Sequence, residues 1–237
     1  AADKRAATLA VQMIFQDPFA SLNPRMRVED IIGEAPRIHG LVSKAETSDY
    51  VDEIMKKVGL DPSLKKRYAH QFSGGQRQRI GIARALAVKP KFLVCDEAIA
   101  ALDVSIQAQV INLFMDLRSE LGLTYLFISH NLAVVRQVSD QIGVMYLGRI
   151  AELAPAESLF RRPRHPYTRA LLDSVLTPEP GLGVPDVGLG DIMPDPANIP
   201  SGCRFHPRCP ACFAPCAATT PRLTTLEDGL VECHLAG

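Results

Sequence analysis

The chain alternates between short apolar runs and longer stretches whose apolar residues recur at helical spacing. Each apolar run ends in polar or acidic residues, which is typical of buried strands entering loops. The predicted strands are residues 11–15, 92–95, 124–128 and 142–147, and the predicted helices include residues 51–58, 80–87, 106–121 and 132–138. Strands that alternate with helices indicate an α/β fold with a parallel sheet covered by helices. We expect functional side chains in the loops beyond the C-terminal ends of those strands.

The composition is that of an ordinary globular protein. Of the 237 residues, 47% are hydrophobic and 22% are charged. No apolar run approaches the roughly 18–20 residues that span a bilayer, and the first ten residues lack the apolar segment of a secretory signal. Lys and Arg together number 26, as do Asp and Glu. Because a protein that grips nucleic acid usually carries a basic excess, we expect no nucleic-acid partner.

The composition changes after residue 176. Eleven of the 26 residues from 177 to 202 are Pro or Gly, which is typical of a linker. We therefore predict three parts: an enzyme-like domain over residues 1–153, a helical segment and linker over residues 154–202, and a Cys-rich tail over residues 203–237.

Five of the six cysteines lie between residues 203 and 233, whereas Cys95 stands alone in a predicted strand and is expected to be a buried small hydrophobic residue. Without a secretory signal, a metal or cluster site is favoured over a disulfide framework. Cys209 and Cys212 have the short spacing of a zinc knuckle, but the other gaps are wider. The spacing therefore leaves an iron–sulfur cluster, a zinc site and unligated thiols as alternatives.

The segment Ser73-Gly74-Gly75-Gln76 leads into a predicted helix. Ser73 can act as the N-cap, and Gln76 can complete a capping box. The two glycines permit close approach of the backbone to a ligand, and free N–H groups at a helix start attract anions. The segment therefore predicts an anion site, with an ordinary capped helix as the alternative.

Polar and acidic residues follow three of the predicted strands. Asp96 and Glu97 come directly after a buried strand, where two acids are costly unless they meet a cation or a ligand. The first can hold Mg²⁺ and the second can polarise a water, as phosphoryl transfer requires, although an acidic loop at the sheet edge is the alternative. His130 and Gln16 follow two further strands. Each is weaker evidence by itself, since a single His in such a place is more often structural.

In their order along the chain, these motifs resemble those of ATP-binding cassette (ABC) ATPases over about residues 10–153. The segments similar to the oligopeptide and dipeptide importer branch are residues 15–24, 102–110, 165–168 and 202–210. The resemblance implies an α/β fold: a partial, P-loop NTPase-like ABC ATPase core with a helical subdomain and a Cys-rich C-terminal extension. It also implies ATP hydrolysis that energises peptide import at the cytoplasmic face of the cell membrane. The implied partners are a second ABC ATPase subunit, transmembrane permease subunits and, indirectly, a peptide-binding protein.

The resemblance also implies a role for each motif residue. Gln16 corresponds to the Q-loop glutamine that touches Mg²⁺ and water, Glu97 to the general base, and His130 to the switch histidine. Contacts to ATP are implied for Ser73, Gly74, Gly75, Gln76, Asp96 and Asp103, and contacts to Mg²⁺ for Asp96 and Gln16. In the tail, the resemblance implies a [4Fe–4S] cluster, with zinc as the alternative and Cys212 as a spare thiol. The implied ligands are Cys203, Cys209, Cys216 and Cys233.

The sequence departs from the family pattern in several places. The phosphate loop Gly-x-x-x-x-Gly-Lys-Ser/Thr is absent from the 237 residues, because no glycine is followed by Lys. Ala98, Ala100 and Asn131 stand where other residues are more usual. We therefore expect a fragment of such a subunit that binds ATP weakly by itself. The alternatives are a non-catalytic partner and an inactive remnant that contributes only the signature half of an ATP site.

Overall fold

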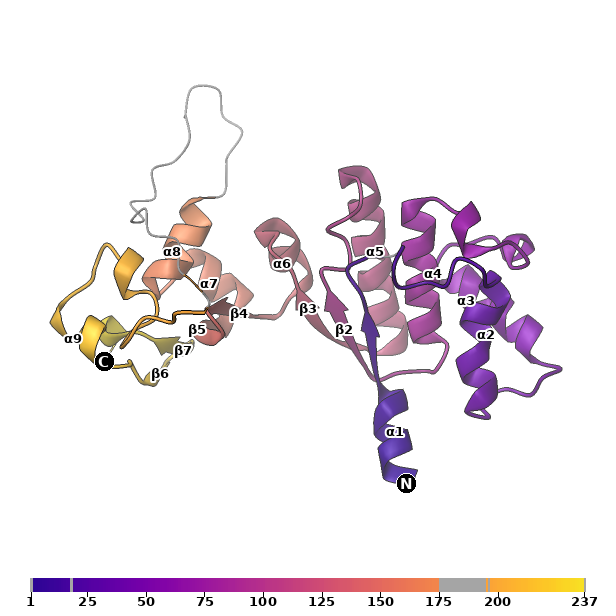
Figure 1. The fold of residues 1–237 in the computed structure, drawn as a ribbon, viewed down its shortest axis with the longest axis horizontal. Helices are drawn as coiled ribbons and strands as arrows, with labels where there is room; N and C mark the ends of the chain where they lie inside the picture. The colour runs from indigo at the N-terminus through magenta and orange to yellow at the C-terminus, as the bar shows by residue number, and fades with distance from the viewer. Residues whose placement is uncertain (1, 18, 175–194, 196, 237) are drawn as a thin grey trace. The chain divides into compact units, whose positions relative to one another are not determined.

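The computed structural model describes residues 2–17, 19–174, 195 and 197–236, and the chain divides into two compact units, Ala1–Asn131 and Leu132–Gly237 (Figure 1). Most of the linker expected from the sequence, residues 177–194 and 196, lies outside the described residues. Among the helices that are described, none is both long and apolar enough to cross a membrane. The boundary expected at residue 153 falls inside a strand, whereas the contacts between residues separate the units after Asn131.

The first unit is built on a parallel sheet of three strands in the order β1 (Val11–Ile14), β2 (Phe92–Asp96) and β3 (Thr124–Ile128). These are three of the strands predicted from the apolar runs, and their parallel pairing is confirmed. In the register of the sheet, Ile14 lies opposite Cys95 and Asp96 lies opposite Ile128. All three strands therefore end at the same edge.

Two long helices accompany this sheet. Helix α4 (Gly74–Leu86) packs against β1, and α5 (Val104–Leu121) presents a buried apolar stripe in which the ring of Phe114 meets the rings of Tyr125 and Phe127 edge-on. Helix α5 ends at Gly122, whose left-handed backbone, φ 63°, closes the helix as a glycine does without strain. Helix α1 (Ala2–Ala10), which the pattern did not predict, leads directly into β1.

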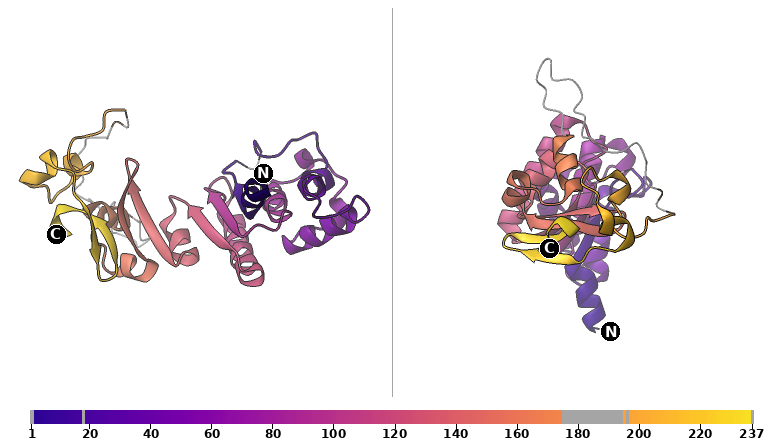
Figure 2. Two further views of the ribbon diagram at one scale, coloured as in Figure 1. Left: turned by 90° about the horizontal axis from the view of Figure 1, so that it is seen from below. Right: turned by 90° about the vertical axis from the view of Figure 1, so that its left-hand side faces the viewer.

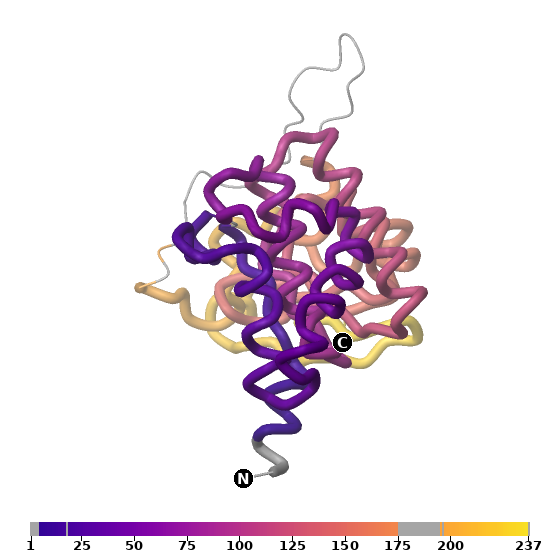
Figure 3. The backbone as a smooth tube through the Cα atoms, turned by 90° about the vertical axis from the view of Figure 1, so that its right-hand side faces the viewer, coloured from indigo at the N-terminus to yellow at the C-terminus, as the bar shows by residue number. Residues whose placement is uncertain are grey.

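A helical layer completes the first unit and faces the viewer in Figure 3. It consists of α2 (Val28–Ile38) and α3 (Thr47–Lys57), both packed on α4, followed along the chain by the short turns η1 (Pro62–Leu64) and η2 (Ala69–Gln71). The predicted helical face of α3 is confirmed, because its buried residues are Val51, Ile54 and Met55. Burial of such a stripe supplies most of the stability of a short helix.

The second unit holds a separate antiparallel sheet (Figures 1 and 2). Its strands are β4 (Gln141–Tyr146), β5 (Arg149–Pro155), β6 (Leu223–Leu226) and β7 (Gly229–Glu232), in the order β4-β5-β7-β6. The predicted strand at 142–147 therefore forms, but it is wrong to place it in the parallel sheet. A tight turn at Leu147 and Gly148, both with positive φ, joins β4 to β5 as a hairpin.

Short helices surround this second sheet. They are α6 (Leu132–Val138), α7 (Ala156–Arg161), α8 (Pro166–Asp173), η3 (His206–Arg208), α9 (Ala214–Ala218) and η4 (His234–Ala236). The core lies where α6 and α7 meet β4 and β5, around Ile142, Val144 and Leu159. The tail is part of this fold, because β7 pairs directly with β5 and its Val231 is fully buried.

Candidate functional site

Three of the residues singled out in the sequence meet at the C-terminal edge of the parallel sheet. Because Ile14 lies opposite Cys95, the residues two positions further on, Gln16 and Glu97, come side by side. Gln16 Nε2 donates a hydrogen bond of 2.5 Å to Glu97 Oε2, and His130 Nδ1 lies 3.0 Å from Glu97 Oε1. An ionised carboxylate only accepts hydrogen bonds, so Nδ1 carries the proton in this contact. Both carboxylate oxygens of Glu97 are therefore engaged.

The backbone of Glu97 is unusual. Its φ is 45°, a left-handed value that costs a residue with a Cβ roughly 1–3 kcal/mol. Two hydrogen bonds hold it there, since its N–H donates to the carbonyl of Ile128 at 3.0 Å and its own carbonyl accepts from Ala100 N–H at 3.0 Å. The side chain of Glu97 remains 26% exposed and that of His130 73% exposed. The structure thus holds a carboxylate at the sheet edge in reach of solvent.

The other two acids expected at the site, Asp96 and Asp103, take no part in the contact of Gln16, Glu97 and His130. Asp96 is the last residue of β2 and is partly buried. Glu97 comes after the end of β2 and has a left-handed backbone, so the alternation of side chains along the strand does not extend to it. Asp103 is the exposed N-cap of α5, and its carbonyl accepts from Gln107 N–H at 2.8 Å while its side chain caps nothing. Carboxylate and amide oxygens of Asp96 and Gln16 are the donor type that Mg²⁺ takes, which fits the expected ion.

The capping box predicted at the start of α4 is confirmed. The hydroxyl of Ser73 accepts from the N–H of Gln76 at 3.4 Å, and Gln76 Oε1 accepts from the N–H of Ser73 at 3.1 Å. The side chain of Gln76 is therefore used within the cap. The N–H groups of Gly74 and Gly75 belong to the first turn of α4, where backbone donors have no partner within the helix.

Gly75 also has a packing role that the sequence did not reveal. A Cβ at Gly75 would come 2.6 Å from Cγ2 of Ile106 on α5, closer than side chains approach. The glycine is thus required for the contact between α4 and α5, whether or not a ligand approaches its backbone. Gly74 has more room, since a Cβ there would meet Phe19 and Leu102 at an ordinary 3.9 Å.

Two arginines of α4 hold the segment that follows Gln16, and sequence reasoning missed them. The guanidinium of Arg77 lies 4.3 Å from the centroid of the Phe19 ring, a cation–π contact, and its Nε donates to the carbonyl of Phe72 at 2.9 Å. Arg84 Nη1 donates to the carbonyl of Ser21 at 2.6 Å. The two arginines are seven residues apart, which is about two helical turns, so they lie on the same side of α4. This spacing was the signal in the sequence that could have identified them.

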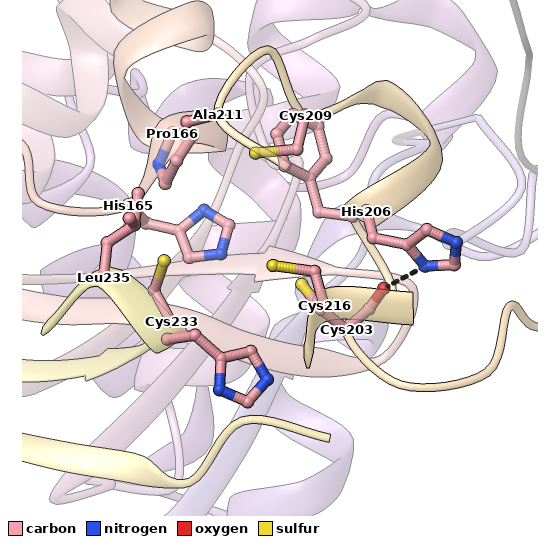
Figure 4. Close-up of a pocket in the computed structure, with 11 residues that line it drawn as sticks. His165, Pro166, Cys203, His206, Cys209, Ala211, Cys216, Cys233 and Leu235 are labelled. Atoms are coloured by element: carbon pink, nitrogen blue, oxygen red, sulfur yellow. Dashed lines mark hydrogen bonds between the residues drawn. The ribbon is translucent and has the colours of Figure 1, made fainter. Parts of the chain in front are cut away.

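A second candidate site lies in the second unit. Cys203, Cys209, Cys216 and Cys233 line one pocket, together with His165, and their thiols point into the same space (Figure 4). Burial raises the pKa of the Cys209 thiol to about 11 and raises the pKa of the Cys203 and Cys233 thiols as well. Cys212 is exposed and does not line the pocket, and all six cysteines are free.

The donor set of this pocket suits a thiolate-bound metal or cluster, because four thiols from separate segments converge there. Within the described residues, however, no three Cys, His, Asp or Glu side chains already stand in an arrangement that holds a metal ion. Burial lowers the pKa of His165 to about 4, so its ring is neutral at physiological pH. Burial thus disfavours the charged forms of three of the thiols, those of Cys203, Cys209 and Cys233, and of the imidazole.

Comparison with known proteins shows which family the chain belongs to. The family described as "ABC transporter" matches residues 2–100, and the family described as "Oligopeptide/dipeptide transporter, C-terminal region" matches residues 151–216. The "Putative peptide import ATP-binding protein" of Brucella ovis is 52% identical over 229 residues, which cover 97% of this chain and 72% of the relative. The chain belongs to the ATP-binding subunits of ABC transporters, in the oligopeptide/dipeptide branch.

Other members of the ABC transporter family agree with this assignment. The "Di/tripeptide transport ATP-binding protein DppF" of Pseudomonas aeruginosa is 50% identical over 226 residues, covering 95% of this chain and 70% of the relative. Among solved structures, cbiO1 of Clostridium perfringens, part of the ABC transporter complex cbiONQ, matches with a TM-score of 0.59 and 27% identity. That match covers 67% of this chain and 62% of cbiO1 and supports the ABC ATPase fold.

The two family matches divide the candidate sites of this ABC transporter subunit between them. The ABC transporter match contains Gln16, the segment Ser73 to Gln76, and Glu97. The oligopeptide/dipeptide match contains His165 and the first three cysteines of the pocket and ends at Cys216. The resemblance inferred from the motifs is thus confirmed at the level of family and branch.

Proposed function

We propose that this chain is the part of an ATP-hydrolysing subunit that carries its hydrolytic residues but not its phosphate loop, and that the subunit energises peptide import. The observation that carries the proposal is the placement of Glu97 between Gln16 and His130 at the edge of the parallel sheet. The names of the relatives, which describe peptide and di/tripeptide transport, supply the cargo. Peptides are therefore the proposed substrates of transport, and ATP is the proposed substrate of hydrolysis.

In this proposal Glu97 is the general base that takes a proton from the attacking water. Gln16 and His130 occupy one acceptor site on each of its oxygens, and the second site on either oxygen can accept a hydrogen bond from the water and then its proton. With Nδ1 of His130 bound to Glu97, its Nε2 is the ring nitrogen that remains to contact a phosphate oxygen. Gln16 orients the water through its amide.

The remaining residues of the site bind and orient. Bound ATP supplies the phosphoryl group, and Mg²⁺ neutralises its charge. Asp96 and Gln16 are proposed to hold the ion, and Asp103 to lie at the seam with a second subunit. The backbone donors of the segment Ser73 to Gln76 are proposed to bind the terminal phosphate of the ATP held by that second subunit.

The proposal includes the assembly in which such a subunit works. Its partners are a second ABC ATPase subunit and transmembrane permease subunits, with a peptide-binding protein acting indirectly. The subunit then sits at the cytoplasmic face of the cell membrane, the inner membrane where a cell has two. We also propose that the chain has three functional parts, which are residues 1–153, 154–202 and 203–237.

For the cysteine pocket we propose a [4Fe–4S] cluster on Cys203, Cys209, Cys216 and Cys233. The convergence of the four thiols in one pocket supports this. Anaerobically purified protein should contain iron and sulfide in near equal amounts. Cys209→Ser should abolish the colour and Cys212→Ser should preserve it. Colourless protein with one zinc per chain would contradict the cluster and favour the zinc alternative.

Peptide uptake tests the proposed function. In a bacterium that retains the cognate permease and binding protein but lacks this subunit, expression of the native gene should restore uptake of radiolabelled di- and tripeptides. The Glu97→Gln variant, expressed at the same level, should fail to restore it. Restored growth without peptide uptake, or full uptake by the variant, would contradict the proposal.

A further inference from the structure

The buried carboxylate of Glu152 is the starting point for an inference about the cysteine pocket. Glu152 lies on β5, opposite Val231 of β7, and is only 1% exposed. Its Oε1 accepts from the N–H of Arg164 and its Oε2 from the N–H of His165, both at 2.9 Å. A buried carboxylate is costly unless such donors satisfy it, and hydrogen bonds to a charged acceptor are among the strongest in proteins. The carboxylate therefore fixes the backbone at residues 164 and 165.

The side chain of His165 is fixed as well. Its Nδ1 accepts from the N–H of Tyr167 at 3.0 Å and so caps α8. The ring is buried and forms part of the wall of the cysteine pocket. The backbone and the ring of His165 are therefore each held by a hydrogen bond.

The ring of His165 in turn supports the loop that carries two of the thiols. Its centroid lies 5.7 Å from that of Phe205, which is almost fully buried. Cys203 and Cys209 pack against the cluster formed by Phe205, Tyr146 and Ala151. A path of direct contacts therefore runs from Glu152 through His165 and Phe205 to the thiol-bearing loop.

We propose that Glu152 is a positioning residue for the cysteine pocket and acts through His165, whose ring holds the loop of Cys203 and Cys209 in place. This inference rests on the cysteine site proposed above, which it deepens by naming what shapes the pocket. It concerns the metal-free chain, so it does not require that the cluster be correct.

Pulsed alkylation of the full, metal-free chain, with each cysteine followed by peptide mass spectrometry, tests the proposal. Glu152→Gln loses one of the two acceptors and should raise the alkylation rates of Cys203 and Cys209 by about tenfold. Cys95, in the other unit, should not change. The control is Glu157→Gln on α7, an exposed acid whose ion pair with Arg161 is also exposed, and it should leave all rates unchanged.

A double-mutant cycle separates positioning from a general structural effect. His165→Asn keeps an N-cap acceptor and the backbone N–H but removes the ring, so it should itself raise the rates at Cys203 and Cys209. If Glu152 acts through His165, adding Glu152→Gln to this variant should change the rates less than about twofold. Additive effects, as expected for a direct effect of the charge or a general loosening, would overturn the proposal.

Two further outcomes are decisive. If Glu152→Gln does not fold, the alkylation rates of the His165→Asn variant test the inference. Rates at Cys203 and Cys209 equal to those of the wild type would overturn it. The double-mutant cycle can show that Glu152 acts through His165 while the chain takes up neither iron nor zinc. That result would contradict the cluster proposal and leave this inference standing.

Discussion

At the scale of single residues, Glu97 combines features that rarely coincide. It has a left-handed backbone, a carboxylate whose two oxygens both have side-chain partners, and a position beyond the end of a buried strand. Residues with sparsely populated backbone angles persist where the surrounding structure holds them, and they concentrate at functional sites. The hydrogen bond from Glu97 N–H to the carbonyl of Ile128 supplies that support.

Cys95 provides a prediction about pH. Burial raises the pKa of its thiol to about 12, from 9.0 for an ordinary thiol. Above pH 9 the unfolded chain therefore releases this proton while the folded chain keeps it, so stability is lost as the pH rises toward 12, by about 1.4 kcal/mol per unit. In Cys95→Ala, which has no thiol to ionise, the urea midpoint should fall less steeply between pH 9 and 11 than in wild type. Parallel pH profiles would contradict the buried, neutral thiol.

The residues of the sheet-edge site could be named from the sequence, but their contacts could not. Gln16 and Glu97 are 81 positions apart, and only the pairing of β1 with β2 brings them together. The cap formed by Ser73 and Gln76 was predictable because it is local. The structure confirms that the side chain of Gln76 is used within that cap, whereas the resemblance had implied a contact to ATP for it.

At the scale of elements, the junction between α4 and α5 depends on the absence of a side chain at Gly75. Replacing Gly75 by Ala would place a methyl group 2.6 Å from Ile106 Cγ2 and should destabilise the chain by about 1–3 kcal/mol, the usual cost of overpacking. The matched control is Gly81→Ala in the same helix, where a Cβ meets nothing within 4 Å. That change should stabilise the chain by about 0.5–1 kcal/mol.

Urea unfolding followed by circular dichroism would measure both changes. The steric origin requires that Ile106→Ala relieve the cost of Gly75→Ala, so the two substitutions together should cost less than the sum of each alone. If Gly75→Ala proved as harmless as Gly81→Ala, the proposed contact between the helices would be wrong.

Strand positions were predictable from apolar runs, whereas strand partners were not. The run at 142–147 correctly indicated a strand, but β4 pairs with β5 in an antiparallel sheet. Strand β5 went unpredicted because its apolar residues are interrupted by Glu152, whose burial depends on backbone donors from the loop before α8. Periodicity carries no information about such long-range partners.

At the scale of the whole molecule, the chain consists of two units with separate sheets, and the tail closes the second. Gly229 begins β7 against β5, and a Cβ there would come 2.3 Å from the carbonyl oxygen of Leu153. Gly229→Val should therefore separate β7 from β5. Hydrogen exchange should show lost protection in β4 to β7 and unchanged protection in β1 to β3. Loss of protection in both units would contradict their independence.

The central claim is that this chain supplies the Glu97-based hydrolytic site of a full-length subunit that powers peptide import. Its most direct test is ATP hydrolysis coupled to peptide uptake by the importer reconstituted in liposomes with its binding protein. Glu97→Gln should reduce both rates by about 10²–10⁴-fold, the usual contribution of a general base, while ATP binding persists. Glu120→Gln, an exposed acid at the end of α5, is the control and should keep wild-type rates. A Glu97→Gln importer that retained more than about a tenth of the wild-type rate would contradict the account.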